Sequence, residues 1–201
     1  MSLERFYPIV DSAVWVGRLV GVGAQFIQLR IKDSGGERLR REVHHAMTIC
    51  RRSGAALVIN DHWQIALDAG ADWIHLGQDD LDEADIDAIR ANGARLGIST
   101  HSPEELDRAL TLDPDYVALG PIFPTLLKAM PFAPQGLERI GEWKRLIGER
   151  PLVAIGGLTV ERAAQCLARG ADSVAVVTDI TLNADPEGRA AQWLAMTQAA
   201  P

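Results

Sequence analysis

The sequence predicts an α/β fold, namely a single (βα)8 TIM barrel with a parallel eight-stranded sheet. Eight short apolar runs are bounded by turn residues and separated by segments with helical spacing, and eight βα units are the number that closes a barrel. Three junctions also repeat one pattern, because GVGAQFIQLR, DAGADWIHLG and ARGADSVAVV each place a glycine and an alanine shortly before a strand. The chain has 201 residues, so we expect one domain over residues 1–201.

The predicted strands follow one another along the whole chain. Helices are expected between them, for example in ERLRREVHHAMTICRRSG and PEELDRALTL, where apolar residues recur with helical period. The longest irregular stretch is 121–136, whose four prolines exclude a continuous helix, and a loop of this length is typical of a functional lid. The strands are expected at 6–10, 26–30, 57–60, 73–76, 95–99, 116–120, 152–155 and 173–177.

Composition narrows the class of protein. Hydrophobic residues make up 47% of the chain, but no charge-free apolar stretch is long enough to span a membrane, and the start lacks a signal-peptide pattern. A net charge of -7 disfavours nucleic-acid binding, which depends on a basic surface. Cys50 and Cys166 lack metal-ligand spacing and are interpreted as small buried side chains. We therefore expect a cytoplasmic enzyme by default, and self-association into a homo-oligomer is left open.

Polar residues alternate at the end of the second predicted strand. Gln28, Arg30 and Lys32 share one side of the strand, toward the barrel axis or mouth, whereas Leu29 and Ile31 should pack against helices. Long polar groups inside a barrel are costly unless an anion meets them, and a guanidinium with an ammonium suits phosphate oxygens. The alternative is a set of buried ion pairs with acidic neighbours.

Two aspartates follow two other strands. Asp61 and Asp80 could each supply a carboxylate oxygen to Mg2+, which keeps several waters and takes its other ligands from substrate phosphates. Each has an alternative role, because Asp61 could cap the following helix and Asp80 begins an acidic run that leads into another. The rest of that run is assigned to the helix start: Asp82, Glu83, Asp85 and Asp87.

Glycines and short polar segments follow the last strands. Gly156 and Gly157 after the seventh strand, with Val177 and Thr178 after the eighth, lie where barrels commonly bind phosphate through backbone N–H groups. The alternative is an ordinary tight turn. Lys128 in the long loop is either a solvated lysine or a phosphate clamp.

The histidines are not spaced along the sequence as metal ligands or as partners of a catalytic nucleophile would be. His44 and His45 fall in a predicted helix, whereas His62, His75 and His101 fall near strand ends. We interpret most of them as structural or supporting residues.

The same segments carry a family resemblance. QLRIK, IND, HLGQDDL, GISTHS, ALGPIFPT followed by a lysine, APQGLE, VAIGG and VAVVTDIT occur in this order, and with them the chain resembles thiamine-phosphate synthase, also called thiamine-phosphate pyrophosphorylase, from about residue 6 to residue 181. The resemblance implies a barrel enzyme, a transferase of thiamine biosynthesis. It would join hydroxymethylpyrimidine diphosphate to thiazole phosphate, giving thiamine phosphate and releasing pyrophosphate with the help of Mg2+.

The resemblance also implies roles for individual residues. Asp61 and Asp80 would bind Mg2+, and Arg30, Lys32, Ser99 and Lys128 would act in catalysis on the diphosphate substrate. The residues implied to contact that substrate are Gln28, Leu29, Arg30, Ile31, Lys32, Asn60, Ser99 and Lys128. Those implied to contact the thiazole phosphate are Thr125, Leu126, Leu127, Gly157, Val177 and Thr178.

One loop position departs from the family pattern. The family loop usually reads PT, any residue, then TK, whereas this chain has Leu127 where the second threonine is expected. A hydroxyl is therefore missing from the loop. Two other functions share the barrel: a thiazole tautomerase, which handles a thiazole phosphate alone, and a catalytically silent barrel that binds thiamine precursors. The diphosphate and magnesium residues argue against the first, and only Leu127 favours the second.

Overall fold

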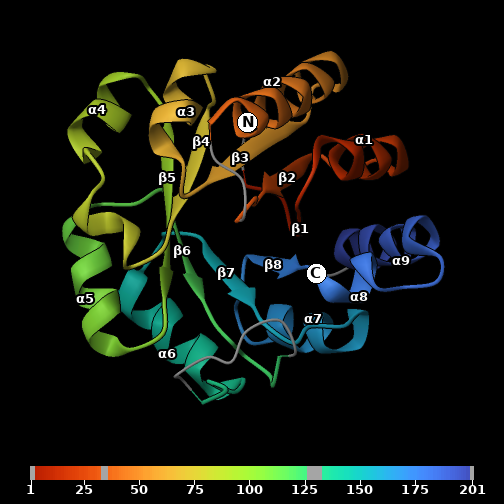
Figure 1. Cartoon of the computed structure of the whole chain (residues 1–201). Helices are drawn as coiled ribbons and strands as arrows, with labels where there is room; N and C mark the ends of the chain where they lie inside the picture. Colours follow the sequence, from red (N-terminus) through yellow and green to blue (C-terminus); the bar gives the residue numbers. More distant parts are fainter. Residues whose placement is uncertain (1–2, 33–35, 126–132, 200–201) are drawn as a thin grey trace.

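The strands close into a ring in chain order. The computed structural model describes residues 3–32, 36–125 and 133–199. Its eight strands form one closed barrel in which each strand pairs in parallel with the next and β8 pairs with β1 (Figure 1). The strands are β1 (Phe6–Val10), β2 (Phe26–Leu29), β3 (Ala56–Asn60), β4 (Trp73–Leu76), β5 (Arg95–Thr100), β6 (Tyr116–Leu119), β7 (Leu152–Ile155) and β8 (Ser173–Val176).

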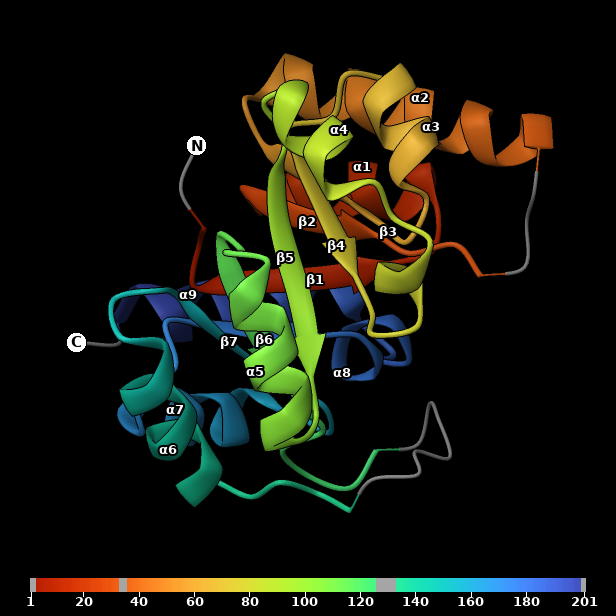
Figure 2. The same ribbon diagram turned by 90° about the vertical axis from the view of Figure 1, so that its left-hand side faces the viewer.

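Helices surround this ring on the outside. Side chains cap several of them, since Ser12, Ser102 and Thr159 each accept a hydrogen bond from a backbone N–H in the first turn. Figure 2 shows the barrel from the side, with α5 lying along β5. The helices are α1 (Ala13–Val22), α2 (Gly36–Ser53), α3 (Trp63–Asp68), α4 (Ile86–Ala91), α5 (Pro103–Thr111), α6 (Glu138–Ile147), α7 (Val160–Ala168), α8 (Thr178–Thr181) and α9 (Pro186–Ala199), with a 3-10 turn η1 at Asp80–Asp82.

The predicted fold is confirmed, and each predicted strand agrees with the observed one to within one residue at either end. Cys50 in α2 and Cys166 in α7 are buried free thiols, as expected. Within residues 3–32, 36–125 and 133–199, no helix has both the length and the apolar character to cross a membrane.

Alternation along the strands produces two separate apolar cores. The larger one lies between the sheet and the helices and takes, for example, Leu29, Ile59 and Val117. The smaller one fills the barrel itself with side chains such as Tyr7, Phe26 and Trp73, so the barrel is packed and not a pore. Polar residues that continue this inward series must therefore sit above the smaller core, at the mouth.

A glycine makes the inner core fit. A Cβ atom on Gly97 of β5 would collide with the ring of Tyr116 on the neighbouring strand β6. Tyr116 is fully buried, and its ring contacts Tyr7 edge-on with centroids 6.0 Å apart. The absent side chain at Gly97 is thus what lets a tyrosine turn into the barrel and bring its hydroxyl to the centre.

Candidate functional site

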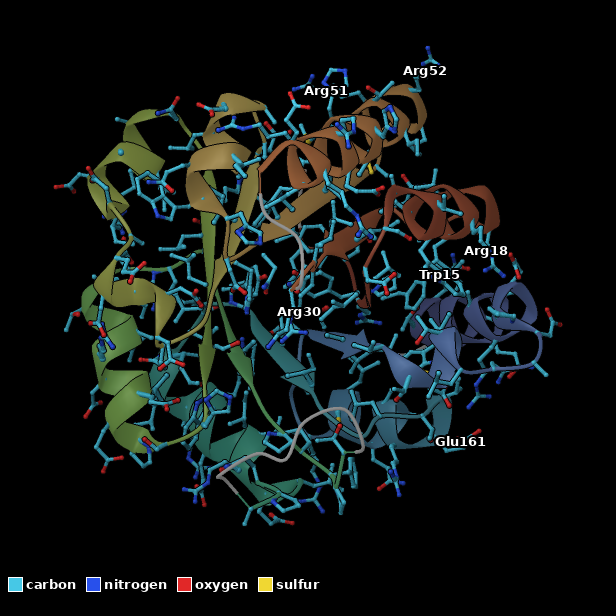
Figure 3. All side chains as sticks on the ribbon, viewed as in Figure 1. Trp15, Arg18, Arg30, Arg51, Arg52 and Glu161 are labelled. Atoms are coloured by element: carbon cyan, nitrogen blue, oxygen red, sulfur yellow. The ribbon has the colours of Figure 1, made fainter. Side chains whose placement is uncertain are left out.

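A cavity of about 630 Å³ opens at the carboxyl ends of the strands. Its wall is built by the strand ends and by the loops that follow them. Figure 3 shows Arg30 in the middle of the ring, whereas Arg18, Arg51 and Arg52 lie at the outer rim. The predicted site residues that line the cavity are Gln28, Arg30, Lys32, Asn60, Asp61, Asp80, Ser99, Thr125, Gly156, Gly157, Val177 and Thr178.

The alternation predicted for the second strand is confirmed. Gln28 is buried inside the barrel, and Arg30 and Lys32 continue on the same side into the cavity. Leu29 and Ile31 instead pack in the outer core, so their side chains do not line the cavity. Burial lowers the pKa of Arg30, and the charges of two nearby aspartates oppose this effect.

Those aspartates are Asp61 and Asp80, which come together from different strands. Burial, the charge of Asp80 and a hydrogen bond between the two carboxyl groups raise the pKa of Asp61 to about 6. Asp61 has φ of 63°, a left-handed backbone conformation that is uncommon outside glycine. Two carboxylates forced together in this way gain from a shared cation, so their chemistry fits Mg2+.

The alternative helix-capping role of Asp61 is wrong. Helix α3 takes His62 as its N-cap, and no side-chain hydrogen bond caps it. Asp80 does begin the 3-10 turn, but its Oδ2 accepts a hydrogen bond from the Gly77 N–H at 3.1 Å and its side chain lines the cavity. In the parts of the chain that the structure describes, no group of three His, Cys, Asp or Glu side chains is placed to hold a metal. Mg2+ held by these two carboxylates would keep several waters and take its other ligands from substrate phosphates.

The rest of the acidic run serves local structure, and Asp85 and Asp87 lie at the start of α4 as predicted. Asp82 forms an ion pair of 2.6 Å with Arg108, and its side chain is 73% exposed. Asp85 is the N-cap of α4 and accepts a hydrogen bond from the Ala88 N–H. The Asp80 side chain thus lines the cavity, whereas Asp82 and Asp85 make contacts outside it.

The loop after β6 packs on the two glycines after β7. Gly157 has φ of 65°, and a Cβ atom there would collide with the carbonyl oxygen of Pro124. The Phe123 N–H donates to the Gly156 carbonyl at 3.0 Å. Glycine at these positions thus brings the loop, with Thr125 at its described end, over the cavity. Leu126, Leu127 and Lys128 lie outside the described residues.

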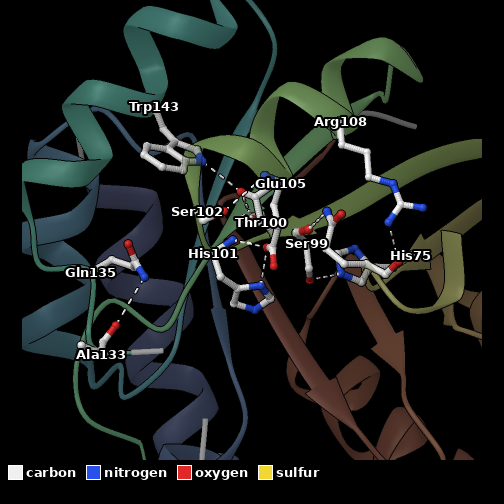
Figure 4. Close-up of polar contacts among 12 residues, drawn as sticks. His75, Ser99, Thr100, His101, Ser102, Glu105, Arg108, Ala133, Gln135 and Trp143 are labelled. Atoms are coloured by element: carbon white, nitrogen blue, oxygen red, sulfur yellow. Dashed lines mark hydrogen bonds and ion pairs between the residues drawn. The ribbon is translucent and has the colours of Figure 1, made fainter. Parts of the chain in front are cut away.

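A hydrogen-bonded network crosses the interior below Arg30. Figure 4 shows the bond between His75 and Ser99, whose ring Nε2 and Oγ atoms are 2.8 Å apart. The Nδ1 atom of His75 contacts the Tyr116 hydroxyl at 2.8 Å. Burial, with a smaller effect from the charge of Arg30, lowers the pKa of His75 to about 3, so the ring is neutral at physiological pH.

The sequence interpretation gives several cavity residues no role in the site: it treats His75 and His101 as structural or supporting residues and does not name Tyr7 or Glu105. His75, Tyr7, His101 and Glu105 all line the cavity, and His101 Nδ1 lies 2.7 Å from Glu105 Oε2. One signal was present for His75, because it follows Trp73 with period two on a buried strand and must therefore point inward. His101 lies just before Ser102, the N-cap of α5, so the spacing of neighbours along a helix face does not account for its contact with Glu105.

Comparisons with known proteins agree over nearly the whole chain. A family model described as thiamine monophosphate synthase matches residues 6–180. A thiamine-phosphate synthase of Rhizobium etli is 57% identical, covering 98% of this chain and 97% of its own. One from Neisseria meningitidis serogroup B is 50% identical, over 91% and 89%. The solved structure of a thiamine phosphate pyrophosphorylase from Pyrococcus furiosus superposes with a TM-score of 0.86 at 25% identity, covering 98% of this chain and 96% of that one.

Proposed function

The chain belongs to the thiamine monophosphate synthase family, and we propose that its cavity joins a pyrimidine diphosphate to a thiazole phosphate with the assistance of Mg2+. The protein is a transferase that makes thiamine phosphate. The observation that supports the roles of individual residues is the meeting of Arg30, Asp61 and Asp80 in one cavity of about 630 Å³.

The reaction exchanges one bond for another. The bond between the pyrimidine methylene carbon and the diphosphate oxygen breaks, and the diphosphate leaves with the electron pair as pyrophosphate. The thiazole nitrogen then donates its lone pair to the methylene carbon. No protein nucleophile is required, because the departure of a stabilised anion makes the carbon electrophilic by itself.

The basic residues stabilise the charge that develops on the leaving group. Arg30 offers a planar fork of donors that matches phosphate oxygens, and Lys32 adds a second positive charge at the mouth. Asp61 and Asp80 would hold Mg2+, which when bound neutralises phosphate charge as a Lewis acid. Ser99 and Asn60 would contact the diphosphate substrate, together with the side chain of Gln28 and backbone atoms of Leu29 and Ile31.

The thiazole phosphate is assigned to the opposite side of the cavity. Gly157, Val177 and Thr178 follow β7 and β8, where backbone N–H groups of barrels commonly bind phosphate. Thr125, with Leu126 and Leu127 as proposed further contacts, would approach from the loop after β6. Lys128 is proposed to act on the diphosphate from the same loop.

We assign the whole chain, residues 1–201, to one domain, and we place the protein in the cytoplasm. Its partners are its small-molecule substrates, without nucleic acid or a membrane, and self-association into a homo-oligomer is compatible with this assignment.

Turnover of both substrates tests the proposal. Purified protein with the pyrimidine diphosphate, the thiazole phosphate and Mg2+ is expected to release thiamine phosphate and pyrophosphate in equal amounts. Isomerisation of the thiazole phosphate alone, without condensation, would indicate the tautomerase instead. Binding of either precursor without any turnover would indicate a silent barrel.

A further inference from the structure

Five polar side chains form one continuous chain of hydrogen bonds through the barrel. The Gln28 Nε2 atom donates to the Tyr7 hydroxyl at 2.7 Å, and the Tyr7 hydroxyl lies 2.8 Å from that of Tyr116. The chain continues from Tyr116 to His75 Nδ1 and from His75 Nε2 to the Ser99 hydroxyl, each over 2.8 Å. Gln28, Tyr7, Tyr116 and His75 are all buried, so water does not replace these bonds.

In one direction along this series of hydrogen bonds, every buried donor has an acceptor. If Tyr7 receives a proton from Gln28, its own hydroxyl proton can go to Tyr116, and the Tyr116 proton can then go to His75 Nδ1. In the opposite arrangement Tyr116 donates to Tyr7, so Tyr7 accepts two bonds and its own proton is left buried without an acceptor in the chain. An unsatisfied buried donor is strongly disfavoured, and the first direction therefore prevails.

This direction determines where His75 and Ser99 carry their protons. With Nδ1 accepting from Tyr116, the neutral ring of His75 carries its proton on Nε2 and donates it to the Ser99 oxygen. The Ser99 oxygen accepts this hydrogen bond, and the Ser99 hydroxyl keeps its own proton for another partner. Ser99 lines the cavity, where that partner would be a substrate atom.

We propose that Tyr116 and His75 are positioning residues that present the Ser99 hydroxyl to the cavity as a hydrogen-bond donor. The site would accordingly select a substrate that places a hydrogen-bond acceptor, such as a heteroaromatic nitrogen, next to Ser99. This inference rests on the proposed function for the identity of the substrate. The direction of the hydrogen bonds is a property of the protein alone.

NMR spectroscopy tests the direction without any turnover. In 15N-labelled protein, the signals of His75 are assigned by their absence from a His75→Gln variant. We expect Nε2 to be protonated and Nδ1 to be an acceptor. The same tautomer is expected in Tyr7→Phe, because Tyr116 still donates to Nδ1. A proton on Nδ1 in the parent protein, or on both nitrogens, would overturn the proposal.

Calorimetric binding of the pyrimidine diphosphate tests the positioning role. Tyr116→Phe keeps the ring packing but removes the donor to His75, and we expect the Kd to rise about fivefold, as for the loss of one hydrogen bond. In a Ser99→Ala background the same substitution should have no further effect, because it acts through Ser99. An equal rise in Kd in both backgrounds would show a role that bypasses Ser99 and would reject the proposal.

Thr100→Val supplies the matched control. The Thr100 hydroxyl is also buried at the end of β5, but it accepts from Trp143 Nε1 and donates to the Ala118 carbonyl on the outer side of the sheet. The control should lower the melting temperature and leave the Kd unchanged. If Thr100→Val raised the Kd as much as Tyr116→Phe does, the loss of any buried hydroxyl would weaken binding. That result would contradict a specific positioning role for Tyr116 and His75. The Kd is measured with one substrate and without turnover. A protein that binds this substrate but does not turn it over would therefore count against the proposed function and not against the positioning role.

Discussion

Asp179 in α8 is bound by Arg189 in α9 through two hydrogen bonds, of 2.7 Å from Nε and 3.2 Å from Nη2. The Trp193 Nε1 atom donates to the same carboxylate at 2.8 Å. The side chains of Asp179 and Arg189 are largely buried, at 15% and 17% exposed respectively. Because Thr178 directly precedes Asp179, this contact holds the segment that is proposed to bind the thiazole phosphate.

Asp179→Asn should therefore weaken one substrate selectively. The variant keeps its size but loses the charge that Arg189 binds, and α8 becomes less firmly held. We expect the KM for the thiazole phosphate to rise about threefold to tenfold, corresponding to about 1 kcal/mol, with an unchanged KM for the pyrimidine diphosphate. Glu187→Gln is the control, because its ion pair with Arg18 is more exposed and joins α1 to α9. Equal shifts in both KM values would contradict this assignment.

Removal of Asp80 should abolish the metal-dependent reaction. Asp80→Ala is expected to lower kcat/KM by at least a hundredfold, because a carboxylate ligand of Mg2+ is lost. Asp82→Ala should change it by less than about twofold, since Asp82 pairs with Arg108 on the surface. EDTA should stop the parent enzyme, and added Mg2+ should restore it. Similar losses in both variants would show that the acidic run acts as a whole.

Asp61 should make the metal-free protein less stable as the pH rises. Its pKa is raised from 3.8 to about 6, so the folded state binds more protons than the unfolded state between these values. Stability therefore falls as the pH rises through this window, by on the order of 1 kcal/mol after screening. Asp61→Asn should remove this fall and melt higher than the parent above pH 6. Melting temperatures measured from pH 4 to 8 in EDTA test this prediction. The same pH dependence in both proteins would show that ionisation of Asp61 does not destabilise the fold.

Arg30 should serve the reaction more than the fold. Arg30→Ala is expected to lower kcat/KM by about 10²–10³-fold, the cost of a lost charge-assisted contact at the transition state. The control is Arg51→Ala at the rim, where Arg51 donates to the carbonyls of Ala69 and Gly70 (Figure 3). That variant should alter the melting temperature slightly and leave turnover intact. A large drop in melting temperature with normal turnover for Arg30→Ala would favour a structural ion pair.

Leu127→Thr tests the departure from the family loop. A threonine would restore one hydroxyl, and a hydrogen bond to a charged partner contributes up to about 3 kcal/mol, so kcat/KM should rise by roughly tenfold to a hundredfold. Little change in stability is expected. Steady-state kinetics with both substrates measure the effect, and unchanged or lower efficiency would indicate that Leu127 has its own packing role.

Much of the site was predictable because a parallel barrel converts strand ends into neighbours. The period of two placed Gln28, Arg30 and Lys32 on one side, and the eight apolar runs placed Asp61 and Asp80 at the same mouth. These inferences need only local periodicity and the rule that parallel strands end together.

Contacts across the barrel required the tertiary structure. The hydrogen bond between Tyr7 and Tyr116 joins residues 109 positions apart, and it exists because Gly97 leaves room for the Tyr116 ring. The choice between helix cap and cavity for Asp61 likewise depended on where α3 begins. The sequence by itself determined which residues face inward, through local alternation. Only the tertiary structure decided which of them touch, because register, ring closure and the space left by a missing side chain are set by packing over the whole barrel.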